Sequence, residues 1–323
     1  MPALGHNGYL VGVKEVTWGT DPAAGYTAQA ILNESFTAKP NNMFIDEVRG
    51  SREGAGRAVA MGIVAGGGVN FDADVEGLLG LMLKSILSTE ALTDNGAGNG
   101  GTHTFTPGAT VPSIAFIVGR DVLADATNIW SYVGGVVDKL SLTAAEGQVL
   151  KANATLSFKN GTNSATGVSP AFTTQNPLVY HSGSVTSGGV SVNCKSFKID
   201  ITSGNYSKRG AIGTRFIQQQ QPGLMKVSGE LDLYFDRMTD VNAFVASTDL
   251  AIVLTLNGTA LGTSTRNLTI TVPVARYTGN PPVIAAPNQE LMLKMPFTAW
   301  QSGAGSPNHI VQVALLNSLR TAY

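Results

Sequence analysis

A pattern of residues occurs twice in this chain, and this duplication limits the possible folds more than any other feature. Gly67-x-Val69-x-Phe71-x-x-Asp74 returns as Gly229-x-Leu231-x-Leu233-x-x-Asp236, an offset of 162 (229 − 67). Ser35-Phe36-Thr37 returns as Ser196-Phe197-Lys198, an offset of 161. Two nearly equal offsets indicate an internal repeat, and 323 residues give each copy the length of an ordinary domain. We therefore expect two related domains, residues 1–165 with an N-terminal arm and residues 166–323.

Each copy shows the same order of predicted elements. In the first, a strand at 31–37 precedes a long polar loop at 41–66 and an alternating strand at 69–72. Asp74 is placed to cap a helix at 75–84, whose Leu78, Leu79, Met82 and Ile86 have helical spacing. In the second, a strand at 226–234 precedes Asp236 or Thr239 as cap and a short helix with Val241, Phe244 and Val245.

Two longer strands close each copy. Residues 139–143 correspond in pattern to 267–271, and the alternating residues of 150–158 correspond to those of 291–299. A polar stretch at 160–169 joins the copies. We predict a mainly β fold with two related β-sandwich or barrel domains, each with one short helix and a long loop.

Charged residues make up only 13% of the chain, against about 25% in typical soluble domains. Two interpretations remain open: a β protein rich in Thr, Ser and Asn, or a surface covered by neighbouring subunits. The net charge of −1 gives no indication of wrapping nucleic acid or of docking on an acidic membrane. The first residues lack the basic and apolar regions of a signal peptide, which favours synthesis in the cytoplasm.

No group of residues predicts catalysis. Residues 96–101 match G-x-G-x-x-G, but a turn precedes them and the strand 102–106 follows, which favours a hairpin tip over a phosphate site. The histidines at 6, 103, 181 and 309 are scattered, and Cys194, the only cysteine, lies in an alternating strand pattern. We expect no enzyme activity and assign no catalytic, cofactor-binding or metal-binding residue.

Two long loops stand out at matching places in the two copies. The first, 41–66, and the second, 205–222, carry charged residues that we take as candidate contacts with other subunits: Asp46, Glu47, Arg49, Arg52, Glu53, Arg57, Lys208, Arg209 and Arg215. Loops longer than about 15 residues within compact domains are usually functional or disordered. A solvated flexible loop is therefore the alternative.

The beginning of the chain resembles a known family. Glu15-Val16-Thr17-Trp18-Gly19-Thr20 is similar to the E-x-T-x-G-T start of the larger tail tube proteins of long-tailed bacteriophages. Arg49-Gly50-Ser51-Arg52, and Gly67 to Asp72 running into a Leu-rich helix, resemble that family's next segment. The resemblance is clearest over residues 8–90. One departure is the run Gly66-Gly67-Gly68, where the family has bulkier residues.

This resemblance implies a virion protein that forms rings, which stack into a hollow tube between capsid and tail tip. β-domains would join edge to edge in the inner wall, and the long loop would reach the next ring. The implied partners are copies of itself and the tape measure, terminator and tip proteins at the tube ends, while DNA passes through without specific binding. No membrane partner is implied. A tail-end relative of the main subunit remains an alternative, as does a carbohydrate- or receptor-binding β protein.

Two further expectations follow from a tube. A channel that releases DNA should have few cations on its lumen face, with polar or acidic residues that include Asp72 and Asp232. Because sixfold rings of single-domain subunits are typical of the family, three two-domain chains would supply the same six domains. A ring of six chains, with the second domain outside the wall, is the alternative to this trimer.

Overall fold

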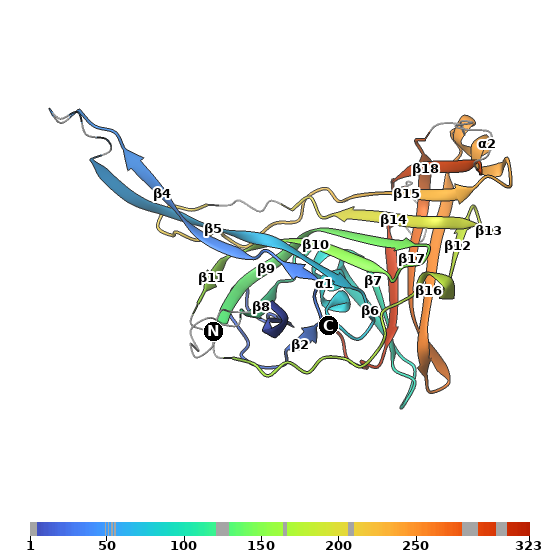
Figure 1. The fold of residues 1–323 in the computed structure, drawn as a ribbon, viewed down its shortest axis with the longest axis horizontal. Coiled ribbons are helices and arrows are strands. Elements are labelled where there is room, and N and C mark those ends of the chain that lie inside the picture. Colours follow the sequence, from blue (N-terminus) through green and yellow to red (C-terminus); the bar gives the residue numbers. More distant parts are fainter. Residues whose placement is uncertain are drawn as a thin grey trace.

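The computed structural model describes residues 5–48, 50, 52, 54, 56–120, 129–163, 167–205, 210–279, 290–301 and 309–323. Its described elements are antiparallel strands, two α-helices and two 3-10 helices (Figure 1), which confirms the mainly β class. The first half comprises residues 5–163, and the second half residues 167–323.

The first half contains eleven described strands. Its elements are a 3-10 helix (Gly5–Asn7), β1 (Tyr9–Lys14), β2 (Thr27–Gln29), β3 (Asn33–Glu34), β4 (Thr37–Ile45), β5 (Arg57–Asp72), α1 (Leu79–Leu87), β6 (Ser88–Asp94), β7 (Gly101–Pro107), β8 (Ile114–Gly119), β9 (Ile129–Ala145), β10 (Lys151–Phe158) and β11 (Asn160–Thr162).

The second half contains eight described strands. Its elements are a 3-10 helix (Tyr180–Ser182), β12 (Gly183–Ser187), β13 (Val190–Val192), β14 (Cys194–Thr202), β15 (Lys226–Tyr234), α2 (Thr239–Val245), β16 (Leu250–Leu261), β17 (Ser264–Tyr277), β18 (Met292–Ala299) and β19 (Gln312–Asn317).

Strands pair in the same order in both halves. In the first half the order is β2, β1, β8, β9, β10 and β5, with β3 and β4 one after the other along the far side of β5. In the second half the order is β13, β12, β16, β17, β18, β15 and β14. α1 follows β5 along the chain, as α2 follows β15. Seven positions and a helix therefore correspond.

The register of paired strands corresponds as well. Val69 of β5 lies opposite Ala154 of β10, and Leu231 of β15 lies opposite Met295 of β18. The sequence repeat equates Val69 with Leu231 and Ala154 with Met295. The predicted match of 150–158 with 291–299 is therefore confirmed by the ladder.

The predicted match of 139–143 with 267–271 joins the right strands, β9 and β17, but its register is wrong. Residues 139–143 of β9 pair with β10, whereas β18 pairs with β17 only over Ala275–Tyr277. Residues 267–271 of β17 pair instead with β19. Short runs of alternating Leu, Ile and Thr fit many registers, so the sequence pattern alone could not select the right one.

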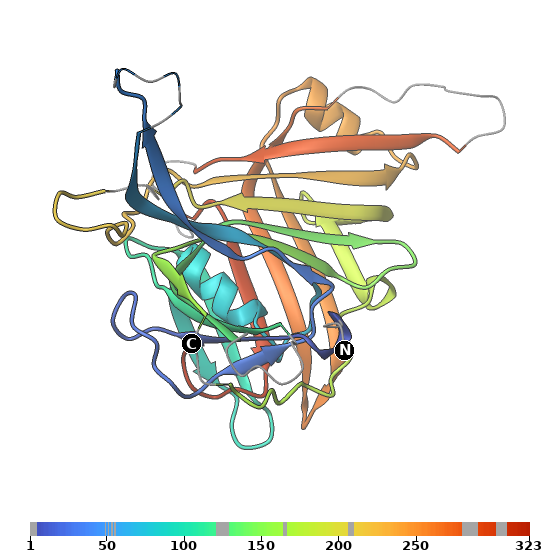
Figure 2. The same ribbon diagram turned by 60° about the vertical axis from the view of Figure 1, so that its left-hand side comes forward.

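One long sheet passes through both halves without a break. Its order is β4, β5, β10, β9, β14, β15 and β18, and the step from first to second half is the pairing of β9 with β14. Figure 2 shows its strands crossing the molecule one beside another, with α2 close to the β18 end. A second connection joins the halves where β19 pairs with both β17 and β7.

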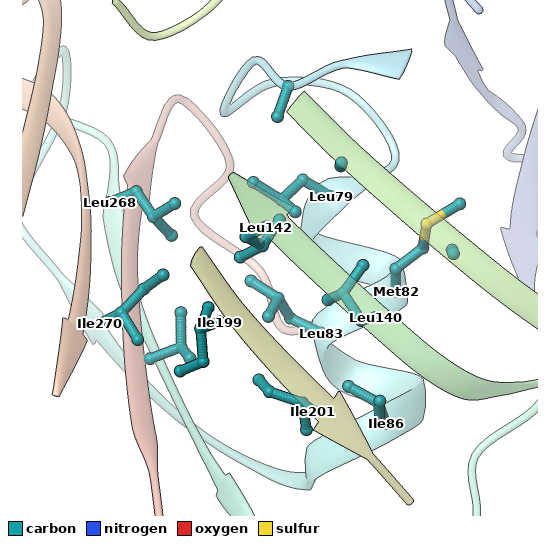
Figure 3. Close-up of a cluster of buried hydrophobic side chains, with 14 of the residues drawn as sticks. Leu79, Met82, Leu83, Ile86, Leu140, Leu142, Ile199, Ile201, Leu268 and Ile270 are labelled. Atoms are coloured by element: carbon teal, nitrogen blue, oxygen red, sulfur yellow. The ribbon is translucent and has the colours of Figure 1, made fainter. Parts of the chain in front are cut away.

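The larger of two hydrophobic core clusters in the described residues lies beneath the junction of the halves. Leu79, Met82, Leu83 and Ile86 of α1 point towards residues of β9, β14 and β17 (Figure 3). All four are at most 3% exposed. Because α1 belongs to the first half and contacts strands of the second, neither half buries this helix alone.

The predicted long loop at 41–66 is wrong, because most of it is a β-hairpin. Asn42 to Ile45 of β4 pair with Arg57 to Ala60 of β5. Gly67 lies beside the short irregular segment at Ser35, between β3 and β4, and a Cβ at this position would approach the Ser35 carbonyl oxygen to 2.4 Å. The glycine run thus permits a close approach within the strand. The strand predicted at 31–37 is interrupted at Ser35 and Phe36, between β3 and β4.

The predicted helix caps are also wrong. Leu78 is the N-cap of α1, and its backbone N–H donates to Gln29 Oε1 on β2 at 3.0 Å. Asp74 accepts from the N–H of Glu76 at 2.9 Å, in the turn before the helix. Met238 is the N-cap of α2. A glutamine from a distant strand replaces the local cap, which no local sequence pattern could predict.

Candidate assembly surfaces

The part of the β4–β5 hairpin that extends beyond β10, residues 39–64, is called the arm; it is a different segment from the N-terminal arm expected from the sequence. Figure 1 shows the arm projecting from the body. Its described apolar side chains are unusually exposed, with Phe44 at 66% and Val64 at 65%, and the others are Met43, Val48, Val59 and Met61. Exposed apolar groups gathered on one projection mark a contact surface.

Of the charges predicted on the first loop, Asp46, Glu47, Arg52 and Arg57 are described, and they lie on or next to the tip of the arm. Asp46 and Arg52 are exposed, and Arg57 Nε donates to Glu47 Oε1 at 3.0 Å, so this pair forms within the arm. Arg49 and Glu53 lie outside the described residues, as do Lys208 and Arg209 of the second loop. The contact of these residues with another ring stays a prediction.

The second loop lies along the arm of the same chain. Arg215 Nε donates to the Met61 carbonyl at 2.9 Å, and the Ile63 N–H donates to the Arg215 carbonyl at 3.0 Å. Arg215 was predicted to contact another ring, whereas here it supports the arm from the side.

The long sheet has an open face, opposite its core. Alternation places Asn70 and Asp72 of β5 on this face, because Val69 and Phe71 are buried, and it places Asp232 there beside buried Leu231. Cross-strand partners form a polar row over the sheet: Asn33, Asn70, Asn153, Ser141, Asp200, Ser228 and Thr298.

Charges of both signs are balanced over the open face. On the six strands from β5 to β18, its described carboxylates are Asp72, Asp138, Asp200, Glu230 and Asp232, and its described lysines are Lys139, Lys151, Lys198, Lys226 and Lys294. Lys294 lies 3.2 Å from Glu230 and 3.8 Å from Asp232. Balanced and paired charges leave little net field for a polyanion.

Asp200 joins the two halves across this face. It accepts a hydrogen bond from the Ser141 hydroxyl of β9 and lies 3.5 Å from both Lys139 and Lys198. Partial burial acts to raise the pKa of Asp200, but the Ser141 hydrogen bond and the two lysines outweigh it, and the pKa is lowered. Burial raises the pKa of Asp138, against the hydrogen bond from Ser157.

The long sheet has a free edge at each end among the described residues. β3 and β4 pair with β5 on one side only. At the opposite end, β18 pairs with β15 over Met292–Thr298, whereas Met292–Met295 pair with no described strand on the other side, and the Pro296 carbonyl accepts from the Thr278 N–H at 2.8 Å. Unpaired edges bind further strands readily.

In the described ranges, side chains that could react or bind a metal do not gather into a site. No three metal-ligating side chains converge there. The G-x-G-x-x-G segment is the tip of the β6–β7 hairpin, as predicted. Burial raises the pKa of the Cys194 thiol to about 12, which keeps it protonated. None of the helices in these ranges is long and apolar enough to cross a membrane.

Sequence reasoning missed the contacts of the C-terminal segment with the first half. His103 is fully buried, with Nδ1 2.8 Å from Glu90 Oε1 and Nε2 3.0 Å from the Leu319 carbonyl. Arg320 donates two hydrogen bonds to Asp94 at 2.7 and 2.6 Å. Leu319 and Arg320 are more than 200 positions from His103 and Asp94, and no spacing in the sequence connects them.

Comparison with known proteins gives one family. The model of a family described as phage tail tube protein matches residues 5–299. No curated protein matches the chain.

Proposed function

This chain belongs to the phage tail tube protein family and is a structural subunit of a tail tube, and we propose that three copies close a ring of six related β-domains. The two domains are residues 1–165 and 166–323, products of an internal duplication, and they alternate around the ring. The corresponding order of seven strands and a helix in the two halves supports the duplication.

The joint between β9 and β14 is the template for the joint between chains. β14 corresponds to β3 and β4, whose outer edge has no described partner. Because β17 is the counterpart of β9, the next chain's β3 and β4 would continue the long sheet beyond its β18 end, on the side of β18 that faces β17. A repeated joint of one geometry closes a ring when the rotation at each step divides the circle evenly.

The unbroken long sheet favours three chains over six. A second domain placed outside the wall as decoration would have no reason to share the wall's sheet, whereas here β9 pairs with β14 over seven residues, from Lys139 to Ala145. The link between the domains also makes every second joint intramolecular, which lowers the entropic cost of closing the ring.

The open face of the long sheet is the proposed wall of the channel. We expected few cations on the lumen, and this face instead carries five lysines with five carboxylates, including Asp72 and Asp232. Both arrangements achieve low affinity for DNA, because tight binding requires cations free to replace the counterions of phosphates. Pairs such as Lys294 with Glu230 reduce that freedom.

The arm is the proposed contact between stacked rings. Its exposed apolar side chains, with Phe44 as the largest, would be covered by the neighbouring ring. Covering them contributes about 25 cal/mol per Å2 of apolar surface, so that roughly 100 Å2 contributes about 2.5 kcal/mol, against about 0.2–1 kcal/mol for an exposed charge pair. At the ends of the tube, other tail proteins would take the place of a ring.

The family match favours the tail tube over a carbohydrate- or receptor-binding β protein. Cryo-electron microscopy of tubes assembled from the purified chain tests the arrangement. We expect the open face of β9, β10, β14 and β15 to line the channel and the arm to contact an adjacent ring. A channel lined by β16 and β17 instead would contradict the proposal.

A further inference from the structure

α1 closes the joint between the two halves from below. Its apolar residues are buried against β9 of the first half and β14 and β17 of the second (Figure 3). Leu83 is 0% exposed and Ile86 is 3% exposed. The helix therefore fills the space under the junction of the two strand sets.

α2 occupies the corresponding position in the second half, and it packs Val241, Ala243 and Phe244 on its own chain but leaves Met238 and Val245 exposed. Met238, Val241 and Val245 have the i, i+3, i+7 spacing of one helical face. Val241 is 7% exposed where α2 packs against β17, whereas Met238 is 54% and Val245 71% exposed. One apolar stripe is thus buried in its middle and bare at both ends.

α2 is held firmly even though its apolar ends are bare. Asp240 is 2% exposed and accepts hydrogen bonds from the Ser187 hydroxyl at 2.7 Å and from Arg237 Nε at 2.9 Å. The Tyr277 hydroxyl on β17 donates to the same carboxylate at 3.3 Å. Polar contacts therefore fix the orientation of a helix that its own chain covers only in part.

The helix also lies at the end of the long sheet where the next chain would join. Figure 2 shows α2 next to β18, at the opposite end of the sheet from β4. The position of α1 under the β9–β14 joint shows what a helix of this kind covers when the neighbouring domain is present.

We propose that α2 is an interchain plug: Met238 and Val245 pack beneath the β3–β4 side of a second copy of this chain, as α1 packs beneath β14. This inference rests on the ring proposed above. The residues of β14 that share the core cluster of α1 and lie near it in Figure 3, Ile199 and Ile201, correspond through the 161-residue offset to Ala38 and Pro40 of β4. The partner surface is therefore the beginning of β4 in another chain.

The test compares two substitutions on opposite faces of α2. Val245→Lys places a charge in the apolar stripe, and Asn242→Lys places the same charge on the exposed face. A lysine near a helix C-terminus is compatible with the helix dipole, so neither change should unfold α2. Ring formation is measured by native mass spectrometry, and the melting temperature of the unassembled chain reports on folding.

We expect Val245→Lys to raise the concentration needed for ring formation about tenfold or more, because the interface must bury an unpaired charge. Asn242→Lys should assemble like the unchanged chain, and both should melt like it. A photoreactive residue at position 245 should crosslink to residues near 38–40 of another chain. If Val245→Lys lowers the melting temperature, weaker ring formation could result from unfolding, and the crosslink alone then tests the plug.

The outcomes separate the plug from the ring. If the unchanged chain forms rings and Val245→Lys forms them equally well, the plug is wrong and the ring stands. Crosslinks confined to the same chain, or to the second domain of another, would also overturn the plug. If the unchanged chain forms no rings at all, the proposed ring fails and the plug with it.

Discussion

Leu142 of β9 and Ile199 of β14 lie directly opposite each other in the long sheet, although 57 residues (199 − 142) separate them in the chain. Both are fully buried over α1. This pair marks the place where the first half ends its set of strands and the second begins. The halves are therefore joined by a continuous ladder and a shared core.

A shared core predicts that the two halves unfold together. Trp18 and Trp130 lie in the first half, and Trp300 lies in the second. Two variants, one keeping only Trp130 and the other only Trp300 with phenylalanine elsewhere, should give coincident fluorescence transitions in denaturant. Two separated transitions would show that the halves are energetically independent.

Leu83→Ala should destabilise both halves equally. Leu83 is fully buried beneath the joint, and removing such a side chain costs about 2–5 kcal/mol. Both tryptophan probes should shift to lower denaturant by the same amount. Leu32→Ala is the control, since Leu32 is 59% exposed, and it should change stability by less than about 0.5 kcal/mol. A shift seen by the Trp130 probe alone would contradict the shared core.

Acid should weaken the joint through Asp200. Because the folded pKa of Asp200 is lowered, its contribution to stability is present above the unfolded value of about 3.9 and is lost as the pH falls through the folded pKa. Asp200→Asn should lower the melting temperature at pH 7, with an effect of about 1 kcal/mol or less for this partly exposed group. The difference from the unchanged chain should shrink towards pH 3. A constant difference at all pH values would exclude the ionised carboxylate as its cause.

Phe44→Asp should separate ring stacking from ring formation. The side chain is 66% exposed on the arm, so the fold should be unaffected, but a buried carboxylate between rings would be unfavourable. Electron microscopy should show rings without long tubes. Val16→Asp, at a position 95% exposed outside the arm, should form tubes of normal length. Normal tubes from Phe44→Asp would contradict the role of the arm.

Removing carboxylates from the open face should create DNA binding. The double change Glu230→Gln and Asp232→Asn leaves Lys294 without its two partners. Rings of this variant should bind short duplex DNA more tightly, with a steeper salt dependence, while unchanged rings bind weakly. The control Asp46→Asn with Asp94→Asn removes the same charge elsewhere and frees Arg320. Equal binding by both double variants would show that the open face is no special surface.

The alternating buried strands could be predicted from the sequence, whereas the arm and the free edges of the long sheet could not. The repeat of Val69 and Phe71 as Leu231 and Leu233 predicted the matching strands, because alternating burial leaves a period of two. The arm was misread as a loop, because its strands are exposed on both faces and show no such alternation. The free edges of β4 and β18 could not be predicted, since they depend on which distant strands pair.

Other features depend on contacts between distant segments. The pairing of β19 with β7, and the buried contact of His103 with the Leu319 carbonyl, leave no local pattern in the sequence. The apolar stripe of α2 was predicted in part, through Val241 and Val245. Its exposed ends became evident only once the fold showed that the chain buries Val241 but leaves Met238 and Val245 exposed.

Native mass spectrometry of isolated rings tests the central claim most directly. The unbroken sheet through both domains predicts a ring with the mass of three chains, each of 33.5 kDa. Rings can be obtained from the Phe44→Asp variant, in which stacking should be blocked, and compared with rings released from tubes of the unchanged chain. A mass of three chains from both sources is the predicted result, and a mass of six chains from either would contradict the account.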